Sequence, residues 1–373
     1  MGKVLILTSI KPDPYNGGGH PSGLIWEVMT YLRKKNIDYD IFVIPDESSK
    51  FIKRFHLYGL FYFNKFKMKK EYSSIWVYPD NMLFYVPKLF RSRCIVLGPD
   101  SPGLRDARLF QKAHTILFKM IRFFMYSMAL LHEYRVTRDA KCVLVVGRTD
   151  QLWMRKCNQR IKRLKALQQK IYFIRHPYLS KAVIPLSQLK FADKEKGQMN
   201  KRFIFSGLIN ERYTHIFLEK VISLLDLHTA YHFIVTGKAN RWLANLIGSR
   251  GSWRVEYYEW IDNYRDICQI GRDIHCLPDQ VGAGTKNRCL TAMLNGLEIV
   301  STPIGIENIK HAGLSGIYIA ITPQQYAQYM DVVFHKTNTR ECMQKMLEER
   351  RKIRELVEEE YELGMNHIVS MID

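Results

Sequence analysis

The sequence predicts an α/β protein made of two doubly wound domains, each with a parallel sheet covered by helices on both faces. Three observations lead to this prediction. The chain has 373 residues and 47% hydrophobic side chains, enough apolar material for two buried cores. Short apolar runs, several of which end in Gly or Pro, alternate with helical stretches. These runs form two sets of six, separated by a polar segment at 180–200 with little strand pattern.

The predicted strands are continuous apolar runs rather than alternating ones, as expected of parallel strands buried on both faces. The first set is 3–9, 40–45, 74–79, 94–99, 142–147 and 171–177, and the second is 202–207, 231–237, 253–260, 273–278, 298–303 and 316–321. We therefore expect domains at 1–179 and 201–354, with 180–200 as the linker. The charged sequence at 346–369 is typical of a long amphipathic helix, whose end, 355–373, is expected to pack back on the first domain.

Cysteine usage and hydropathy indicate the compartment. Seven cysteines are scattered without a C-x-x-C pair, which argues against a disulfide scaffold and a zinc ribbon and favours a reducing cytoplasm. The first apolar run lacks the long hydrophobic region and cleavage site of a signal peptide. The most apolar stretch, 116–131, is interrupted by Lys119 and Arg122, so it is too short for a membrane span of roughly 20 residues.

Positive charge is concentrated in one part of the chain. The net charge is +20, and residues 51–200 alone hold 30 basic and 9 acidic side chains. Within 51–70 and 109–131, Lys and Arg are mixed with bulky aromatic and apolar residues, which suits the boundary between lipid headgroups and acyl chains. Peripheral contact with an anionic membrane is one interpretation, and a pair of helices with buried aromatics and a solvated basic rim is the other. Nucleic acid, whose bases could stack on the same residues, is the least favoured partner.

The segment 277–309 carries the most specific chemistry. A strand is predicted to end at Pro278, followed by the turn Gly282-Ala283-Gly284-Thr285 and by a helix from about Lys286 to Leu294. Glycines before a helix let backbone N–H groups approach an anion, and the helix N-terminus adds partial positive charge. Lys286 and Arg288 supply full charges for a diphosphate. A glycine turn alone would be weak evidence, since tight βα turns use glycine for geometry.

This segment resembles the donor-binding region of GT-B glycosyltransferases of family four, also called group 1. The family pattern is a Gly-x-Gly turn, basic residues, an apolar helix, Gly, a strand and T-x-x-G. The matching residues are Gly282, Gly284, Lys286, Leu290, Ala292, Met293, Gly296, Val300, Thr302 and Gly305. The segments 202–213, 231–237, 273–278, 171–178 and 9–38 are similar to other parts of the family, so the resemblance covers nearly the whole chain.

The sequence departs from the family at the ribose-binding position. The family usually carries Glu in this helix and often a second Glu eight residues earlier, where this chain has Thr291 and Ala283. We expect Glu307, which follows Thr302 and Gly305, to replace the missing carboxylate, because a carboxylate accepts two vicinal hydroxyls well. The alternative is that Glu307 caps a helix that starts near Asn308.

Further candidates come from both halves. In the first domain, Gly17, Gly18, Gly19 and His20 form a loop that can approach donor phosphates or acceptor sugar, although His20 is equally well an exposed loop residue. Asp100 ends a strand, where ligands bind in such sheets, and either acts as a catalytic residue that orients or deprotonates the acceptor hydroxyl or caps a helix near Gly103. In the second domain, Arg212 and Lys238, which follow Gly207 and Gly237, are candidate diphosphate ligands or ordinary surface cations. His176 is expected to pack rather than react.

The resemblance implies a GT-B fold, with two Rossmann-like domains facing each other across a cleft, and transfer from a nucleotide-diphosphate sugar with retention. Lys286, Arg288 and Arg212 would neutralise the departing diphosphate without an obligate metal. The implied acceptor is a glycan on a polyprenyl diphosphate, in a cytoplasmic enzyme at the inner face of the membrane that serves bacterial O-antigen or capsule synthesis. Two alternatives stay open: a nucleotide-sugar epimerase on the same scaffold, and a catalytically silent GT-B-like protein that binds membrane or RNA, which the missing Glu favours.

Overall fold

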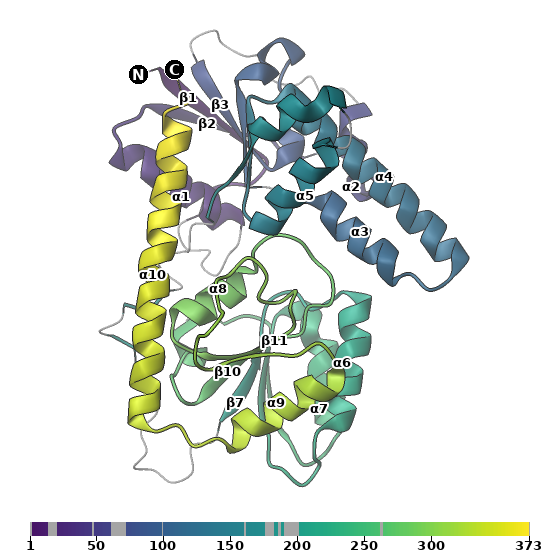
Figure 1. Ribbon diagram of the computed structural model, residues 1–373, viewed down its shortest axis with the longest axis vertical. Helices are drawn as coiled ribbons and strands as arrows, with labels where there is room; N and C mark the ends of the chain where they lie inside the picture. The colour runs from purple at the N-terminus through teal and green to yellow at the C-terminus, as the bar shows by residue number, and fades with distance from the viewer. Residues whose placement is uncertain are drawn as a thin grey trace. The chain divides into compact units, whose positions relative to one another are not determined.

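The computed structural model describes residues 2–13, 21–46, 48–60, 72–98, 100–159, 162–175, 183–185, 188–189, 201–261 and 264–372. The chain divides into two compact units (Figure 1). Unit 1 comprises Met1–Pro177, Gly282–Thr285 and Glu358–Asp373, and unit 2 comprises Tyr178–Val281 and Lys286–Val357. Most of the predicted linker, 180–200, lies outside the described residues.

Unit 1 contains a six-stranded parallel sheet in the order β2-β1-β3-β4-β5-β6. The strands are β1 (Lys3–Thr8), β2 (Tyr39–Val43), β3 (Tyr72–Tyr78), β4 (Cys94–Leu97), β5 (Cys142–Val145) and β6 (Ile171–Phe173). In the centre, Ile6 of β1 pairs with Ile41 of β2 and with Trp76 of β3. The strand order reverses between β1 and β3, which makes their carboxyl ends the switch point where ligands bind in open parallel sheets.

Helices cover both faces of this sheet because successive strand residues point to opposite sides. Val4 and Ile6 face a core formed with α1 and the end of α10, whereas Leu5 and Leu7 face a core formed with η2, α4 and α5. The helices of unit 1 are α1 (Pro21–Lys34), α2 (Lys50–Arg54), α3 (Pro102–Lys112), α4 (Ile116–Asp139), α5 (Arg148–Gln159) and the last turns of α10 (Arg340–Val369), with 3₁₀ helices η1 (Leu57–Leu60), η2 (Asp80–Tyr85), η3 (Lys88–Arg93) and η4 (Lys162–Lys170).

Unit 2 contains a second six-stranded parallel sheet, in the order β12-β11-β10-β7-β8-β9. Its strands are β7 (Arg202–Phe205), β8 (His232–Thr236), β9 (Arg254–Tyr258), β10 (Asp273–Leu277), β11 (Glu298–Ser301) and β12 (Ile317–Ile319). The helices are α6 (Arg212–Leu224), α7 (Arg241–Gly248), α8 (Asn287–Leu294), α9 (Pro323–His335) and the first part of α10. The order reverses between β7 and β10, which places the second switch point there.

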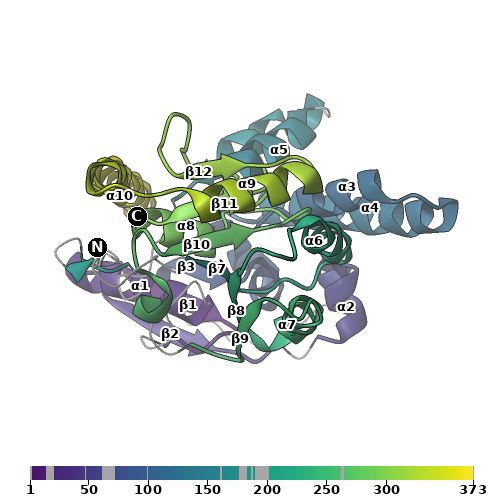
Figure 2. The same cartoon turned by 90° about the horizontal axis from the view of Figure 1, so that it is seen from below.

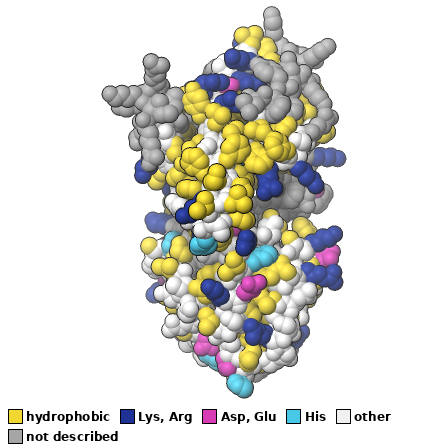
Figure 3. Space-filling model, turned by 90° about the vertical axis from the view of Figure 1, so that its right-hand side faces the viewer, with side chains coloured by type: hydrophobic (Ala, Val, Ile, Leu, Met, Phe, Trp, Pro, Cys, Tyr) yellow, Lys and Arg dark blue, Asp and Glu magenta, His cyan; other side chains and the backbone are white. Residues whose placement is uncertain are grey.

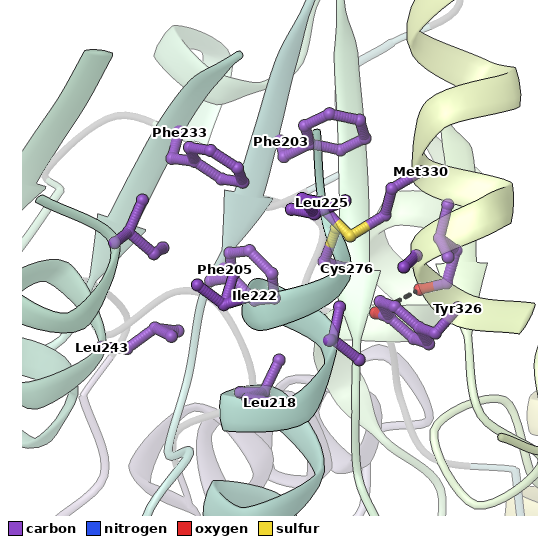
Figure 4. Packing of buried hydrophobic residues seen from close by; sticks show 14 of the residues in the cluster. Phe203, Phe205, Leu218, Ile222, Leu225, Phe233, Leu243, Cys276, Tyr326 and Met330 are labelled. Atoms are coloured by element: carbon purple, nitrogen blue, oxygen red, sulfur yellow. Dashed lines mark hydrogen bonds between the residues drawn. The ribbon is translucent and has the colours of Figure 1, made fainter. Parts of the chain in front are cut away.

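The core of unit 2 also has two sides. Phe203, Phe205 and Phe233 pack with α6, α7 and α9, and the Tyr326 hydroxyl donates to the Val300 carbonyl at 2.9 Å (Figure 4). Ile299 and Leu277 face α8 and α10 on the other side, and Figure 2 shows α6 and α7 on one side of the strands and α10 on the other.

The predicted fold class is confirmed: each of the twelve predicted runs overlaps a strand, and both sheets are parallel with helices on both faces. Continuous apolar runs were a reliable pattern for the central strands, which are buried from both sides, whereas β2, β9 and β12 at the sheet edges are only half-buried or exposed. The helix predicted from about Lys286 is α8, which begins at Asn287 with Lys286 as its N-cap residue. Within the described part of the chain, no helix combines the length and hydropathy that crossing a membrane requires.

Candidate active site

Arg288 lies at the switch point of unit 2. Its guanidinium donates to the carbonyl of Ser206, just after β7, at 2.7 Å, and to the carboxylate of Asp279, just after β10. Gly207 has a φ of +77°, and a Cβ at this position would come within 3.0 Å of the guanidinium. A side chain here would therefore both strain the backbone and displace Arg288, so glycine lets the arginine bridge the two strand ends.

A buried amide fixes the two glycine turns of this edge. Asn240 is fully buried and donates through Nδ2 to the carbonyls of Gly207 at 2.5 Å and Thr236 at 2.6 Å. Its Oδ1 accepts the Ile209 N–H at 3.0 Å. Because Gly207 follows β7 and Thr236 ends β8, Asn240 holds the ends of neighbouring strands in one geometry. Sequence reasoning missed this residue, although an Asn three positions after Gly237 was a usable signal.

Two exposed cations lie at the ends of the same strands. Arg212 is the first residue of α6, which follows β7, and Lys238 opens the 3₁₀ helix Lys238–Asn240 that follows β8. Both were candidates for diphosphate ligands or ordinary surface cations, and the ligand role stays a prediction. Lys286, the N-cap residue of α8, is half-buried and lies beside the amide groups that begin that helix. This edge of unit 2 therefore brings the cations Arg212, Lys238, Lys286 and Arg288 together with the carboxylates of Asp279, Glu211 and Glu307.

Thr302 and Gly305 shape the turn after β11. The Thr302 hydroxyl donates to the Asp279 carbonyl at 2.5 Å and accepts the Gly305 N–H at 3.1 Å. A Cβ on Gly305 would lie 2.6 Å from the Leu277 carbonyl oxygen, so only glycine fits. Glu307 is half-buried in this turn, and no helix starts at Asn308. The alternative that Glu307 caps such a helix is therefore wrong, and its ribose-binding role stays a prediction.

Thr291 occupies the position where the family usually has Glu. It is buried on α8, and its hydroxyl donates to the Asn287 carbonyl at 2.9 Å, one turn back along the same helix. This bond is the usual way in which a helical threonine satisfies its hydroxyl. Thr291 is thus engaged with its own helix.

The glycine turn Gly282–Thr285 belongs to unit 1. The Gly284 N–H donates to both carboxylate oxygens of Asp150 at 3.0 Å, and the Thr285 hydroxyl donates to the Val146 carbonyl at 2.6 Å. Gly284 has a φ of +70°, and a Cβ there would overlap the Asp100 carboxylate. The anion that this turn approaches in the structure is Asp150, so a phosphate-binding role for its N–H groups stays a prediction. Asp150, in the first turn of α5, was missed from the sequence.

Asp100 is exposed just after β4. Its neighbour Ser101, and not Asp100, caps the following helix α3. The Ser101 hydroxyl accepts the Leu104 N–H at 3.0 Å as the N-cap of α3, so the expectation that Asp100 caps this helix is wrong. The same hydroxyl donates to Glu133 at 2.6 Å, and burial raises the pKa of Glu133 to about 7.

Several predicted residues lie outside the described part of the chain, namely Gly17, Gly18, Gly19, His20 and His176. Among the residues that the structure does describe, no group of three or more His, Cys, Asp or Glu side chains is arranged to hold a metal ion.

Comparison with known proteins finds a family match for the second half of the chain. Residues 200–335 match the model of the family glycosyl transferases group 1. No curated protein matches the chain by sequence. Among solved structures, HepE of Anabaena in complex with UDP and glucose aligns over 99% of this chain and 100% of its own, with a TM-score of 0.59 and 11% identity.

Two further structures are similar at the same level. WaaG, a glycosyltransferase involved in lipopolysaccharide biosynthesis, aligns over 95% of each chain with a TM-score of 0.56 and 10% identity. The lipopolysaccharide outer core galactosyltransferase WaaB aligns over 99% of each chain with a TM-score of 0.51 and 11% identity. At this identity the matches show the fold alone. The predicted resemblance to group 1 glycosyltransferases is confirmed by the family match in the second half and by the GT-B fold.

Proposed function

We propose that this chain is a glycosyltransferase that takes its sugar from a nucleoside-diphosphate donor bound at the switch point of unit 2 and transfers it to a glycan acceptor bound on unit 1, with retention of the anomeric configuration. The observation that carries the proposal is Arg288, fixed across the ends of β7 and β10 beneath Gly207. The family match over 200–335 covers this edge, and HepE, which shares the fold, was crystallised with UDP and glucose.

Preplaced cations supply the chemistry that such a donor needs. As the bond to the anomeric carbon breaks, negative charge accumulates on the leaving diphosphate, and fixed positive groups stabilise that charge most in the transition state. Arg288 pairs with Asp279, and Arg212 and Lys286 add two further cations at the starts of the helices that follow β7 and the glycine turn. We propose that these side chains act without an obligate metal and that the acceptor attacks from the face that the diphosphate leaves.

Nucleotide binding tests the donor site directly. We expect calorimetry to detect binding of UDP or GDP, and Lys286→Ala to weaken that binding about 10-fold or more, as expected for a lost charge-assisted hydrogen bond. Lys286 is a half-buried residue at the N-cap of α8, and its substitution should lower the affinity far more than the melting temperature. Arg254→Ala, which removes an exposed cation at the start of β9, is the matched control and should bind as the wild type does.

The same titration separates the proposal from its rival. The buried Thr291, in place of the family's glutamate, favours a catalytically silent protein. If the wild type binds neither UDP nor GDP, the chain is a catalytically silent protein and the donor proposal is wrong. Equal nucleotide affinity of Lys286→Ala and the wild type would mean that Lys286 does not bind the diphosphate.

We further propose that the acceptor is lipid-linked and that unit 1 reaches it by peripheral contact with an anionic membrane. The first half of α4 exposes a row of apolar side chains, with Ile116 80%, Leu117 67% and Met120 66% accessible. Phe118, Ile121, Phe123 and Phe124 are also exposed, and Lys119 and Arg122 lie among them. Contiguous apolar surface rimmed by cations marks contact with a membrane or a partner.

Figure 3 shows that hydrophobic side chains gather on this face of unit 1, with Lys and Arg at their margins. The expected buried aromatics of the alternative interpretation are absent from this part of α4, since Phe123 and Phe124 are exposed. Of the other basic aromatic stretch, 51–70, the structure describes residues 51–60, with Phe51 exposed on α2. WaaG and WaaB are both named for lipopolysaccharide synthesis, which supports a role in bacterial surface-polysaccharide assembly, whether O-antigen or capsule.

A further inference from the structure

His132 and Asp80 form a hydrogen-bonded pair in unit 1. Nε2 of His132, on α4, is 2.9 Å from Oδ2 of Asp80, the first residue of η2. Because a carboxylate only accepts hydrogen bonds, the proton of this bond sits on Nε2. The partners are 52 positions apart in sequence, so no local pattern reveals the pair.

The pair lies at the switch point of the unit 1 sheet. β3 ends at Tyr78 and Asp80 begins η2 two residues later. β3 neighbours β1 at the place where the strand order reverses. Ligands of open parallel sheets bind outside the carboxyl ends of the strands at this point. Asp80 is therefore placed where a ligand of unit 1 is expected.

His132 is held so that it can orient the carboxylate. Its side chain is 2% exposed and sits against the rings of Tyr58 and Phe84, with centroids at 5.9 Å and 5.6 Å. Its Nδ1 has no hydrogen-bond partner among the described residues. Asp80, in contrast, keeps 22% of its side chain exposed. One carboxylate oxygen is thus fixed from within the protein, while part of the group remains open to a ligand.

The surroundings of Asp80 keep it charged and add a second carboxylate. Burial alone would raise the pKa of Asp80, but the charge and hydrogen bond of His132 and the charge of His56 lower it. The pKa of Tyr78 is raised by burial and then by the charges of Asp100 and Asp80, so both carboxylates act on one phenol. Two carboxylates and a phenol at one sheet edge suit a ligand that carries several hydroxyl groups.

We infer that Asp80, oriented by His132, binds hydroxyl groups of the glycan acceptor. The inference rests on the proposed function and adds the acceptor contact to it. Asp80 accepts hydrogen bonds from the sugar, and His132 is a positioning residue that does not touch it. The rival role for the pair is a purely structural link between α4 and η2.

Protein-observed NMR of the ¹⁵N-histidine-labelled full chain, titrated with octyl glycosides of glucose, galactose, mannose and N-acetylglucosamine, separates these roles. We expect at least one glycoside to bind the wild type and to shift the ring ¹⁵N resonances of His132, which are assigned by their loss in His132→Gln. Asp80→Asn keeps the shape but loses the charge, so affinity for that glycoside should fall about 10-fold or more. His132→Gln retains a hydrogen-bond donor towards Asp80. The glycoside affinity of this variant should therefore lie between that of the wild type and that of Asp80→Asn.

Asp46→Asn is the matched control. Asp46 follows β2 in the same unit, but its carboxylate already accepts from Asn81 at 3.1 Å and from Tyr85 at 3.2 Å. This variant should lose stability yet keep glycoside affinity. If no glycoside of the panel shifts His132, or if Asp80→Asn binds as the wild type does, the inference is overturned. UDP binding should be the same in all of these proteins, and its absence in the wild type would overturn the donor proposal instead.

Discussion

Glu133 illustrates how burial of one residue makes stability depend on pH. Its Oε1 accepts both the Ser101 hydroxyl at 2.6 Å and the Gly103 N–H at 2.8 Å. Burial outweighs these bonds and raises its pKa from 4.5 to about 7. Between these values the folded state holds a proton that the unfolded state releases, so the free energy of unfolding falls as pH rises.

We therefore expect Glu133→Gln to remove a pH-dependent loss of stability. Glutamine can keep both bonds through its own Oε1 and carries no charge. The wild type should lose on the order of 3 kcal/mol relative to this variant between pH 4.5 and 7. Urea unfolding at pH 5 and pH 8 measures the difference.

Asp139→Asn is the control for Glu133→Gln in the pH dependence of stability. Although burial alone would raise the pKa of Asp139, the hydrogen bonds and charges of Arg138 and Arg91 lower it. The stability that it contributes is therefore present above the ordinary pKa of an aspartate and is lost as pH falls below it. Its substitution should leave the loss between pH 5 and 8 intact. A wild type and Glu133→Gln with parallel pH profiles would contradict the assignment.

The residues of the site show how far a single sequence leads. Gly207 and Thr302 were placed correctly just after strands, and Arg288 in the first turn of a helix, because each belongs to a motif that follows a recognisable strand. Asn240 and His132 were missed because they contact Gly207 and Asp80, which lie far away in the sequence. Asp279 was missed although its partner Arg288 lies only nine positions further along the chain. The Gly284–Asp150 bond joins residues 134 positions apart, and only the fold brings them together.

At the scale of elements, the positions of strands could be predicted more completely than the burial of helices. Most central strands are buried from both sides, so their apolar runs are nearly unbroken, whereas the edge strand β9 is partly exposed and contains Arg254 and Glu256. α4 is different: its 24 residues include the buried Ala129 and Val136 near the C-terminal end and an exposed apolar N-terminal half. Its composition alone did not decide between a buried helix and a surface one, because both contain the same residue types. Thr115 caps α4, and α3 packs against it as a hairpin (Figure 1).

The exposed half of α4 gives a prediction for membrane contact. The triple variant Ile116→Ser, Leu117→Ser and Met120→Ser should bind phosphatidylglycerol vesicles at least about 10-fold more weakly, since each of these side chains would lose apolar burial in the lipid. Because all three are exposed in the folded chain, the melting temperature should stay the same. Vesicle co-sedimentation measures the affinity.

Leu224→Ser with Leu227→Ser removes exposed apolar groups from unit 2 instead and should leave vesicle binding unchanged. Binding should also weaken as salt rises, because residues 51–200 carry the excess charge. Equal binding by the triple variant and the wild type would exclude α4 as the contact.

On the scale of the whole molecule, the end of the chain completes the unit that its beginning forms. Unit 1 includes Glu358–Asp373, and Met365, Ile368 and Ile372 are fully buried in the core that also contains Val4 and Ile6. The Glu360 carboxylate accepts hydrogen bonds from Arg175 at 2.7 Å and from Arg148 at 2.8 Å. Earlier in the same helix, Met343 and Met346 belong to the core of unit 2. α10 therefore contributes to two separate hydrophobic cores.

This division predicts opposite effects for two truncations within α10. Ile368→Ala should destabilise unit 1 by about 2–5 kcal/mol, the usual range for removing a buried aliphatic side chain, and Met343→Ala should act similarly on unit 2. Native-state hydrogen exchange reports each unit separately, because β1 and β7 peptides exchange through opening of their own core. Ile368→Ala should lose protection in β1 and keep it in β7, whereas Met343→Ala should show the reverse. Equal loss in both strands from either variant would mean that the two cores open together, and the stability of the chain would then be that of one cooperative unit.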